Sequence, residues 1–171
     1  TLHMIFKGGK GRRESLSENR FIHSKFWFPR TVEGLIVLDG LKEPLLKNSS
    51  MYQIGGQPGH RSEELVFSLK SVVSKYQAEG KLVIIQTSDI SKFFDKELIE
   101  DAMITCLKRG ADTKAVRLWY NLNKDTQIRV KTGAGMSDYT TVGAVVGQGT
   151  LGGALLSQGV LDEGIIGEFA P

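Results

Sequence analysis

Apolar residues recur at two different spacings along the chain, and each spacing predicts a different kind of element. Recurrence every three to four residues indicates amphipathic helices, which are predicted over residues 31–46, 62–79, 96–109 and 113–122. Short strands are expected over residues 3–6, 19–22 and 126–132. The stretch 143–161 is expected to form a strand, a glycine turn and a helix. This pattern predicts an α+β fold with one small sheet.

One further segment, residues 81–89 (KLVIIQTSD), contains a continuous apolar run and ends in Asp89. Such a run is typical of a strand that is covered on both faces. We therefore expect this segment to be a buried strand of the sheet. Two aromatic residues, Phe93 and Phe94, and a second acid, Asp95, follow within a few residues.

The 171-residue chain is long enough to form one domain with a buried core, or a fragment of one. The single cysteine, Cys106, excludes an internal disulfide and fits a reducing compartment. It lies on the apolar side of its helix, so packing is its expected role. No apolar run approaches the roughly 20 residues of a membrane span. We therefore expect an intracellular protein, in the cytoplasm or the nucleus, with no membrane partner.

Charge divides the sequence into a basic and an acidic part. Residues 1–61 contain ten Lys and Arg residues against five acids, and residues 62–171 contain twelve against fourteen. All three histidines lie in the basic part. A basic region followed by an acidic one suits a polyanion bound at one end and cations at the other, although a solvated basic face has the same composition.

Two glycine-rich stretches match nucleotide-binding loops locally. Gly147-x-Gly149-x-x-Gly152, with a predicted strand before it and a helix after it, fits the dinucleotide-binding fingerprint. That fingerprint needs a second strand that ends in an acid about 20 residues further on, and only 19 residues follow Gly152. In GGQPGHRS, His60 and Arg61 replace the glycine and lysine of a phosphate loop. A dinucleotide-binding domain stays an alternative, and the glycines imply close backbone approach or a sharp turn.

Asp89 is the best candidate for chemistry on the residues alone. A carboxylate directly after a buried strand is costly without a partner, and a divalent metal ion best offsets that cost. Mg²⁺ takes oxygen ligands from one or two carboxylates and from substrate phosphates, and the Ile90 carbonyl lies beside Asp89. Phe94 begins the next element, where a flat ring can pack against a nucleotide sugar. The structural alternative is that Asp89 caps a turn and that Phe93 and Phe94 belong to the core.

Five stretches resemble, in order, sequence blocks of reverse transcriptases of the group II intron and non-LTR retrotransposon kind. They are FKGGKG, ENRFI, YQIGGQPGHRS, SDISKFFD and VVGQGTLGGALLS, and they span roughly residues 5 to 160. The fourth resembles the block of the first catalytic aspartate, Asp-Ile-x-x-x-Phe-Asp, and is the most specific. The others resemble the basic N-terminal block, the Tyr-Arg-Pro-Ile block, the Gln-x-Gly-Phe-Arg-x-Gly-Arg-Ser block and the Gln-Gly block of that family.

The resemblance implies roles for the residues near the metal ion. Asp89 would bind the catalytic Mg²⁺ or Mn²⁺, and the Ile90 carbonyl would assist it. Phe94 falls at the steric-gate position, where bulk excludes a ribose 2′-hydroxyl and so selects deoxynucleotides. Asp95 is expected to be structural and to orient this segment through hydrogen bonds.

The remaining matches imply contacts with nucleotide and nucleic acid. Gln148 and Gly149 would approach the incoming nucleotide and the template base. Basic residues of the fingers would meet the triphosphate and the template backbone, and these are Arg20, Arg61, Lys7 and Lys10. The implied partners are an RNA template, a DNA primer and a deoxynucleoside triphosphate (dNTP).

The sequence departs from the family at several positions. Gly56 and Gln57 stand where the family has Phe and Arg, and Arg61 is displaced by one position from the second arginine. Gly153 and Ala154 replace the Ser-Pro that usually follows the Gln-Gly block. These differences weaken the expected contact between Arg61 and the triphosphate and predict a looser helix start.

The resemblance implies part of a right-hand polymerase, with helical fingers and an incomplete antiparallel palm sheet. The fingers-like region would span residues 1–80 and the partial palm residues 81–171. The chain begins without Met, and it reaches its end before the paired-aspartate hairpin and the thumb of the family. The polypeptide by itself is therefore expected to be an inactive fragment of a retroelement's RNA-directed DNA polymerase. A non-catalytic nucleic-acid-binding remnant of such an element is the alternative.

Overall fold

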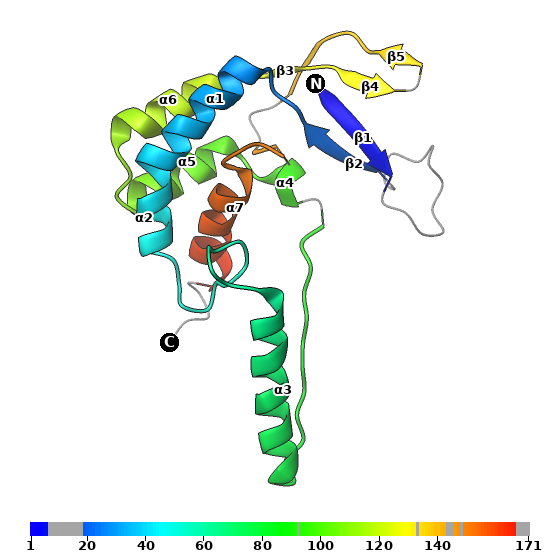
Figure 1. The fold of residues 1–171 in the computed structure, drawn as a ribbon, viewed down its shortest axis with the longest axis vertical. Helices are drawn as coiled ribbons and strands as arrows, with labels where there is room; N and C mark the ends of the chain where they lie inside the picture. Colours follow the sequence, from blue (N-terminus) through cyan, green and yellow to red (C-terminus); the bar gives the residue numbers. More distant parts are fainter. Residues whose placement is uncertain (7–18, 92, 133, 143–145, 148, 167–171) are drawn as a thin grey trace.

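The computed structural model describes residues 1–6, 19–91, 93–132, 134–142, 146–147 and 149–166, and it has a mixed α and β structure (Figure 1). The main sheet has four short strands in the order β2-β1-β4-β5. They are β1 (Leu2–Phe6), β2 (Asn19–His23), β4 (Val130–Thr132) and β5 (Gly135–Met136). A second, two-stranded sheet pairs β3 (Gln127–Ile128) with β6 (Thr140–Thr141). The predicted mixture of helices and short strands is confirmed, but the described residues form two sheets where one was expected.

The main sheet differs from the purely antiparallel sheet that was expected. β1 pairs antiparallel with β2, and β4 pairs antiparallel with β5. β1 and β4, however, are parallel, with Leu2 opposite Val130. A parallel pair needs a long crossover connection, and here more than a hundred residues, including most of the helices, lie between Phe6 and Val130. The expectation of an antiparallel sheet is therefore wrong at this pair.

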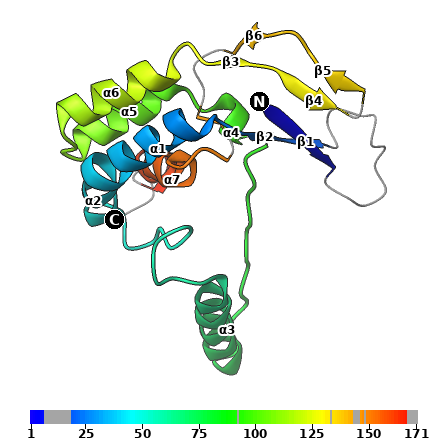
Figure 2. The same ribbon diagram turned by 45° about the horizontal axis from the view of Figure 1, so that its top comes forward.

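The helices pack around α7 (Gly153–Leu161) (Figures 1 and 2). The first is a continuous run of α1 (Trp27–Ile36), the π-helical segment η2 (Val37–Leu41) and α2 (Lys42–Lys47). The others are α5 (Ile99–Lys108), α6 (Thr113–Asn123), the single turn α4 (Phe93–Lys96) and η3 (Asp162–Ile166). The predicted helices are confirmed, except that the first begins earlier, at Trp27, and that residues 96–109 divide between α4 and α5.

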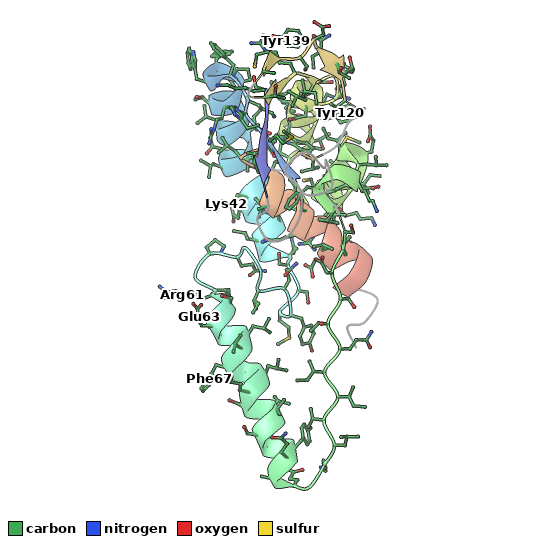
Figure 3. The ribbon with its side chains drawn as sticks, turned by 90° about the vertical axis from the view of Figure 1, so that its right-hand side faces the viewer. Lys42, Arg61, Glu63, Phe67, Tyr120 and Tyr139 are labelled. Carbon is green, nitrogen blue, oxygen red and sulfur yellow. The ribbon has the colours of Figure 1, made fainter. Side chains whose placement is uncertain are left out.

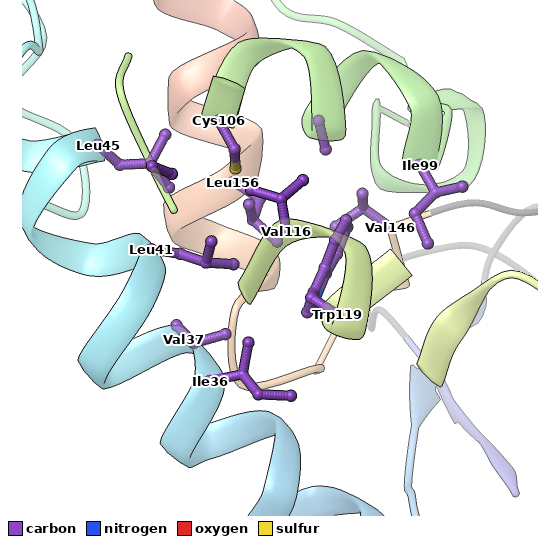
Figure 4. Packing of buried hydrophobic residues seen from close by; sticks show 12 residues of the cluster. Ile36, Val37, Leu41, Leu45, Ile99, Cys106, Val116, Trp119, Val146 and Leu156 are labelled. Atoms are coloured by element: carbon purple, nitrogen blue, oxygen red, sulfur yellow. The ribbon is translucent and has the colours of Figure 1, made fainter. Parts of the chain in front are cut away.

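One hydrophobic core lies between these helices (Figure 4). Its fully buried members are Leu41, Leu45, Ile99, Cys106, Val116, Trp119 and Leu156. Each buried aliphatic side chain of this kind contributes roughly 1.5–3 kcal/mol. Gly40 permits the close packing of η2 on α6, because a Cβ at this position would lie 2.5 Å from the Cβ of Ala115. Core residues come from both sides of residue 80, so residues 1–80 and residues 81–171 together form one core.

Residues 62–90 form an arm that projects from this core (Figures 1 and 2). It consists of α3 (Ser62–Ala78), which Gly80 ends with a φ of 70°, and of the segment 81–90, which runs back along the helix. No residue of α3 is buried, and Leu82 and Ile84 are 88% and 83% exposed. The prediction of a buried strand over residues 81–89 is wrong, because no strand of the described chain pairs with this segment.

Candidate functional site

Asp89 lies near the end of the arm, a few residues before α4. Its side chain is exposed, as is that of Ile90, and it forms no ion pair with any residue that the structure describes. A metal ion was predicted because Asp89 was expected to end a buried strand, and that expectation is wrong. An exposed carboxylate is solvated by water and requires no compensating partner.

Phe94 lies on α4 beside Phe93, and both side chains are half-buried. Their ring centroids are 5.9 Å apart, with the ring planes inclined by 65°. Neither ring belongs to the hydrophobic core, so part of Phe94 is accessible from solvent. Asp95 lies between them and Lys96 on α4, but its side chain is outside the described part of the structure.

Glu97, directly after α4, connects this segment to the region around α7. Its backbone carbonyl accepts a hydrogen bond of 3.0 Å from the N–H of Val146, and its carboxylate accepts one from the Ser157 hydroxyl. The other carboxyl oxygen, Oε1, is buried and has no hydrogen-bond partner within the described residues. Burial raises the pKa of Glu97 to about 7, although the Ser157 hydrogen bond opposes the rise and Asp101 adds to it. This carboxyl group was not singled out from the sequence.

The turn that leads into α7 is held in place by packed glycines. Gly149 has a φ of 93°, which a residue with a side chain rarely adopts. A Cβ at Gly152 would lie 2.9 Å from Cγ2 of Val37, and one at Gly153 would lie 3.1 Å from the Gly147 carbonyl oxygen. These glycines therefore allow the start of α7 to pack tightly, and the packing gives no support to a dinucleotide-binding loop. Gln148 lies outside the described residues.

The glycine turn before α3 also packs on α7. Gly56 has a φ of 66°, and a Cβ there would overlap the side-chain amide of Gln158. The turn over residues 53–57 and the turn over residues 146–152, which are about a hundred residues apart in sequence, thus meet the same helix. The sequence had predicted close backbone approach or a sharp turn at both, and both predictions are confirmed.

The predicted basic contacts are described only in part. Arg61 is exposed at the N-cap position of α3 (Figure 3). It directly precedes Ser62, the first residue of that helix. Arg20 lies on β2, but its side chain is outside the described part of the structure, and so are Lys7 and Lys10.

The described residues do not form a complete metal site. Nowhere among them do three His, Cys, Asp or Glu side chains lie close enough together to hold a metal ion. Mg²⁺ needs near-octahedral oxygen coordination, which one or two carboxylates share with water and substrate phosphates. Asp89 would supply at most one carboxylate, so the remaining ligands of a bound ion would have to come from a nucleotide or from other groups.

A network of buried ion pairs lies at the end of the core where α2, α5 and η3 meet. Nη2 of Arg109 lies 2.7 Å from Oδ2 of Asp162, and its Nε lies 3.2 Å from Oε1 of Glu163. Arg109 also donates to the Leu45 carbonyl at 3.0 Å, and Asp162 accepts from the N–H of Ser50 at 2.7 Å. This network joins α2, α5 and η3. Its guanidinium is fully engaged and buried, so it is structural and not available to a ligand.

The sequence carried a signal for this network that was missed. Arg109 follows Ile99, Ala102 and Cys106 at helical spacing, so it had to lie on the buried face of its helix. A charge on such a face needs a partner, but the sequence does not say which acid supplies it. The packing role predicted for Cys106 is confirmed, since its side chain is fully buried and burial raises the pKa of its thiol to about 12.

Comparison of the chain with protein families, with curated proteins and with solved structures found no match. Within the described ranges, no helix combines the length and the apolar character that crossing a bilayer requires.

Proposed function

We propose that this chain is part of an RNA-directed DNA polymerase of the reverse transcriptase kind, with fingers formed by its first 80 residues and a partial palm formed by the rest. In the reaction of such an enzyme, the 3′-hydroxyl oxygen of the primer attacks the α-phosphorus of a dNTP. A phosphodiester bond forms, the bond to the β-phosphate breaks, and pyrophosphate leaves with the proton passing to solvent or a base.

The observation that supports this proposal best is the meeting of three sequence blocks at α7. The turn over residues 53–57 contacts Gln158 of α7. Glu97, which follows the block containing Asp89, binds both Val146 and Ser157. Blocks that share one nucleotide in a polymerase have to lie side by side, and here the turn over residues 53–57 and Glu97, two residues after the fourth block, both contact α7.

Under this proposal Asp89 supplies one ligand to a divalent ion and Phe94 limits the space around the nucleotide sugar. Among the described residues, no group of three His, Cys, Asp or Glu side chains gathers around Asp89. The chain by itself is therefore expected not to extend a primer, because phosphoryl transfer depends on a full set of positioned metal ligands.

The role of Asp89 can be tested in the chain as it exists. Mn²⁺ with a dNTP should broaden the NMR signals of residues 88–91, and Asp89→Asn should remove that broadening. Asp125→Asn, which changes an equally exposed acid, serves as the control. Equal broadening in the wild type and in Asp89→Asn would remove Asp89 from the proposed metal site.

Activity supplies a second test. With primed RNA, Mg²⁺ and dNTPs, the chain alone should give no extension product above the no-enzyme background. A longer product of the same gene that adds a paired-aspartate hairpin should extend the primer, and Asp89→Asn should abolish this extension. In the same longer protein, Phe94→Ala should admit ribonucleotides, whereas unchanged sugar discrimination would argue against a gate at Phe94.

A further inference from the structure

A groove of about 500 Å³ opens beside the start of α1. This end of α1 lies away from the arm (Figures 1 and 2). Residues from three parts of the chain line it, among them Lys25, Phe26, Leu122, Gln127, Arg129 and Tyr139. Its size is within the range of pockets that hold a nucleotide-sized ligand. None of the described residues that line it is acidic.

Three consecutive aromatic residues, Phe26, Trp27 and Phe28, form a ledge at the start of α1, and Phe26 lines the groove. Phe26 and Trp27 are 72% and 66% exposed. Their ring centroids are 6.1 Å apart, and those of Trp27 and Phe28 are 5.7 Å apart. The ledge is fixed to the fold through Lys25, whose Nζ lies 2.9 Å from Oε2 of the buried Glu33 and also donates to Asn123. Three large rings that remain exposed on a rigid support mark an interaction surface.

Another part of the groove lining combines an aromatic ring with a positive charge. Tyr139 is 62% exposed, and the guanidinium carbon of Arg129 lies 5.2 Å from its ring centroid. Figure 3 shows Tyr139 at the outer end of the molecule. Arg129 pairs with no carboxylate of the described chain, in contrast to Lys25. The groove lining therefore includes a cation without a carboxylate partner among the described residues, together with the rings of Phe26 and Tyr139.

We propose that the groove and the aromatic ledge bind a single-stranded stretch of nucleic acid. Bases would stack on Trp27 and Tyr139, and a backbone phosphate would pair with Arg129. Successive stacking rings beside a cationic groove are what sequence-tolerant single-strand binding requires. Exposed aromatic residues can also insert into a membrane surface. Rings that insert into a bilayer project from a convex surface, however, whereas here the positive charge lies in a concave groove. This proposal goes beyond the polymerase assignment, because it needs neither a metal ion nor catalysis.

Fluorescence anisotropy in EDTA tests this proposal directly. Labelled 12-nucleotide oligomers of uridine and of deoxythymidine serve as probes, and a difference between the two identifies RNA or DNA as the preferred strand. We expect Trp27→Ala and Tyr139→Ala each to weaken binding about tenfold, which is the loss of one stacked base. Arg129→Gln should weaken binding and lower the slope of log affinity against log salt by about one.

The matched controls are Phe67→Ala, an exposed ring on α3, and Arg117→Gln, an exposed cation on α6. Both should leave the affinity unchanged. All five substitutions are at exposed or partly exposed sites, and unchanged circular dichroism and Tm would exclude misfolding. Three results would overturn the proposal: no binding of either oligomer, equal binding by all variants, or binding only to vesicles of phosphatidylcholine and phosphatidylserine. Because the assay contains no metal ion, its failure leaves the tests of Asp89 unaffected.

Discussion

The core around α7 and the arm of residues 62–90 contain similar apolar side chains in opposite environments. In the core, Ile99 and Leu156 are inaccessible to solvent, whereas in the arm Leu82 and Ile84 are almost fully exposed. The difference lies in what surrounds each segment and not in its own residues. Core helices have neighbours on their apolar faces, while the arm has none within the described chain. An apolar pattern thus predicts a surface that favours burial, and it does not identify the partner that covers it.

The largest expected effect tests the buried ion pair that fixes the core. Arg109→Ala should lower the free energy of unfolding by about 3–5 kcal/mol, because it leaves the carboxylate of Asp162 buried without a cation. Urea denaturation measures this loss. Lys108→Ala, at the exposed neighbouring position, should change stability by less than about 0.5 kcal/mol. Similar losses in both variants would contradict a structural role for the network.

The same Ile→Ala substitution in the core and in the arm tests whether the two regions differ in burial. Ile99→Ala should cost about 3 kcal/mol, since it leaves a cavity in the core. Ile84→Ala should change the free energy of unfolding by less than about 0.5 kcal/mol, because Ile84 is already in contact with water. A large loss in Ile84→Ala would mean that the arm is covered in solution, for example by a second copy.

The raised pKa of Glu97 predicts that the free energy of unfolding depends on pH through a group in the core and not in the arm. Its folded-state pKa of about 7 is raised above the usual value of 4.5, so the folded protein retains a proton that the unfolded chain loses. The contribution of Glu97 to stability is therefore fully present below pH 4.5, falls between pH 4.5 and 7, and is smaller by about 2–3 kcal/mol above that range.

Glu97→Gln should abolish this fall, because the amide keeps an acceptor for Ser157 and cannot ionise. Tm measured from pH 5 to 8 should then lose the downward step that the wild type has. Glu43→Gln, at an exposed position on α2, should retain the step. A step that persists in Glu97→Gln would assign the pH dependence to another group.

The smallest expected effect tests backbone packing within the core. Gly40→Ala should cost about 1–2 kcal/mol, since the new methyl group would overlap Ala115 on α6. Gly34→Ala in the same helical run is the control. Its Cβ would lie 3.1 Å from a movable Leu151 methyl group, so the gain in helix propensity should offset any strain. Thermal unfolding of the two variants distinguishes them, and equal Tm values would show that η2 and α6 can separate.

Local patterns predicted the helices but not their partners. The helix over residues 113–122 was predictable because its apolar spacing and the cap at Asp112 are encoded within a few residues. The parallel pairing of β1 with β4 was not, because it joins segments that lie far apart in sequence. The exposure of Asp89 was mispredicted for the same reason, since its environment depends on whether another strand pairs with residues 81–90.

In the candidate site, too, local features could be predicted from the sequence and long-range contacts could not. Packing of the glycine turns was foreseen, because glycine conformation is a local property. The link from Glu97 to Ser157 was not, because it spans 60 residues. The ledge at residues 26–28 was visible as three adjacent rings between Lys25 and Arg30, but its exposure followed only from the fold.

The unpaired segment at residues 82–85 has a consequence for how the protein behaves at high concentration. An extended Leu-Val-Ile-Ile run with both edges open is a template for stacking into cross-β fibrils. Charged residues that flank such runs act as gatekeepers against this stacking. Lys81, which pairs with Glu79 at 2.6 Å, and Asp89 hold these positions, so we expect the charges at the two ends of the run to oppose stacking of the free chain.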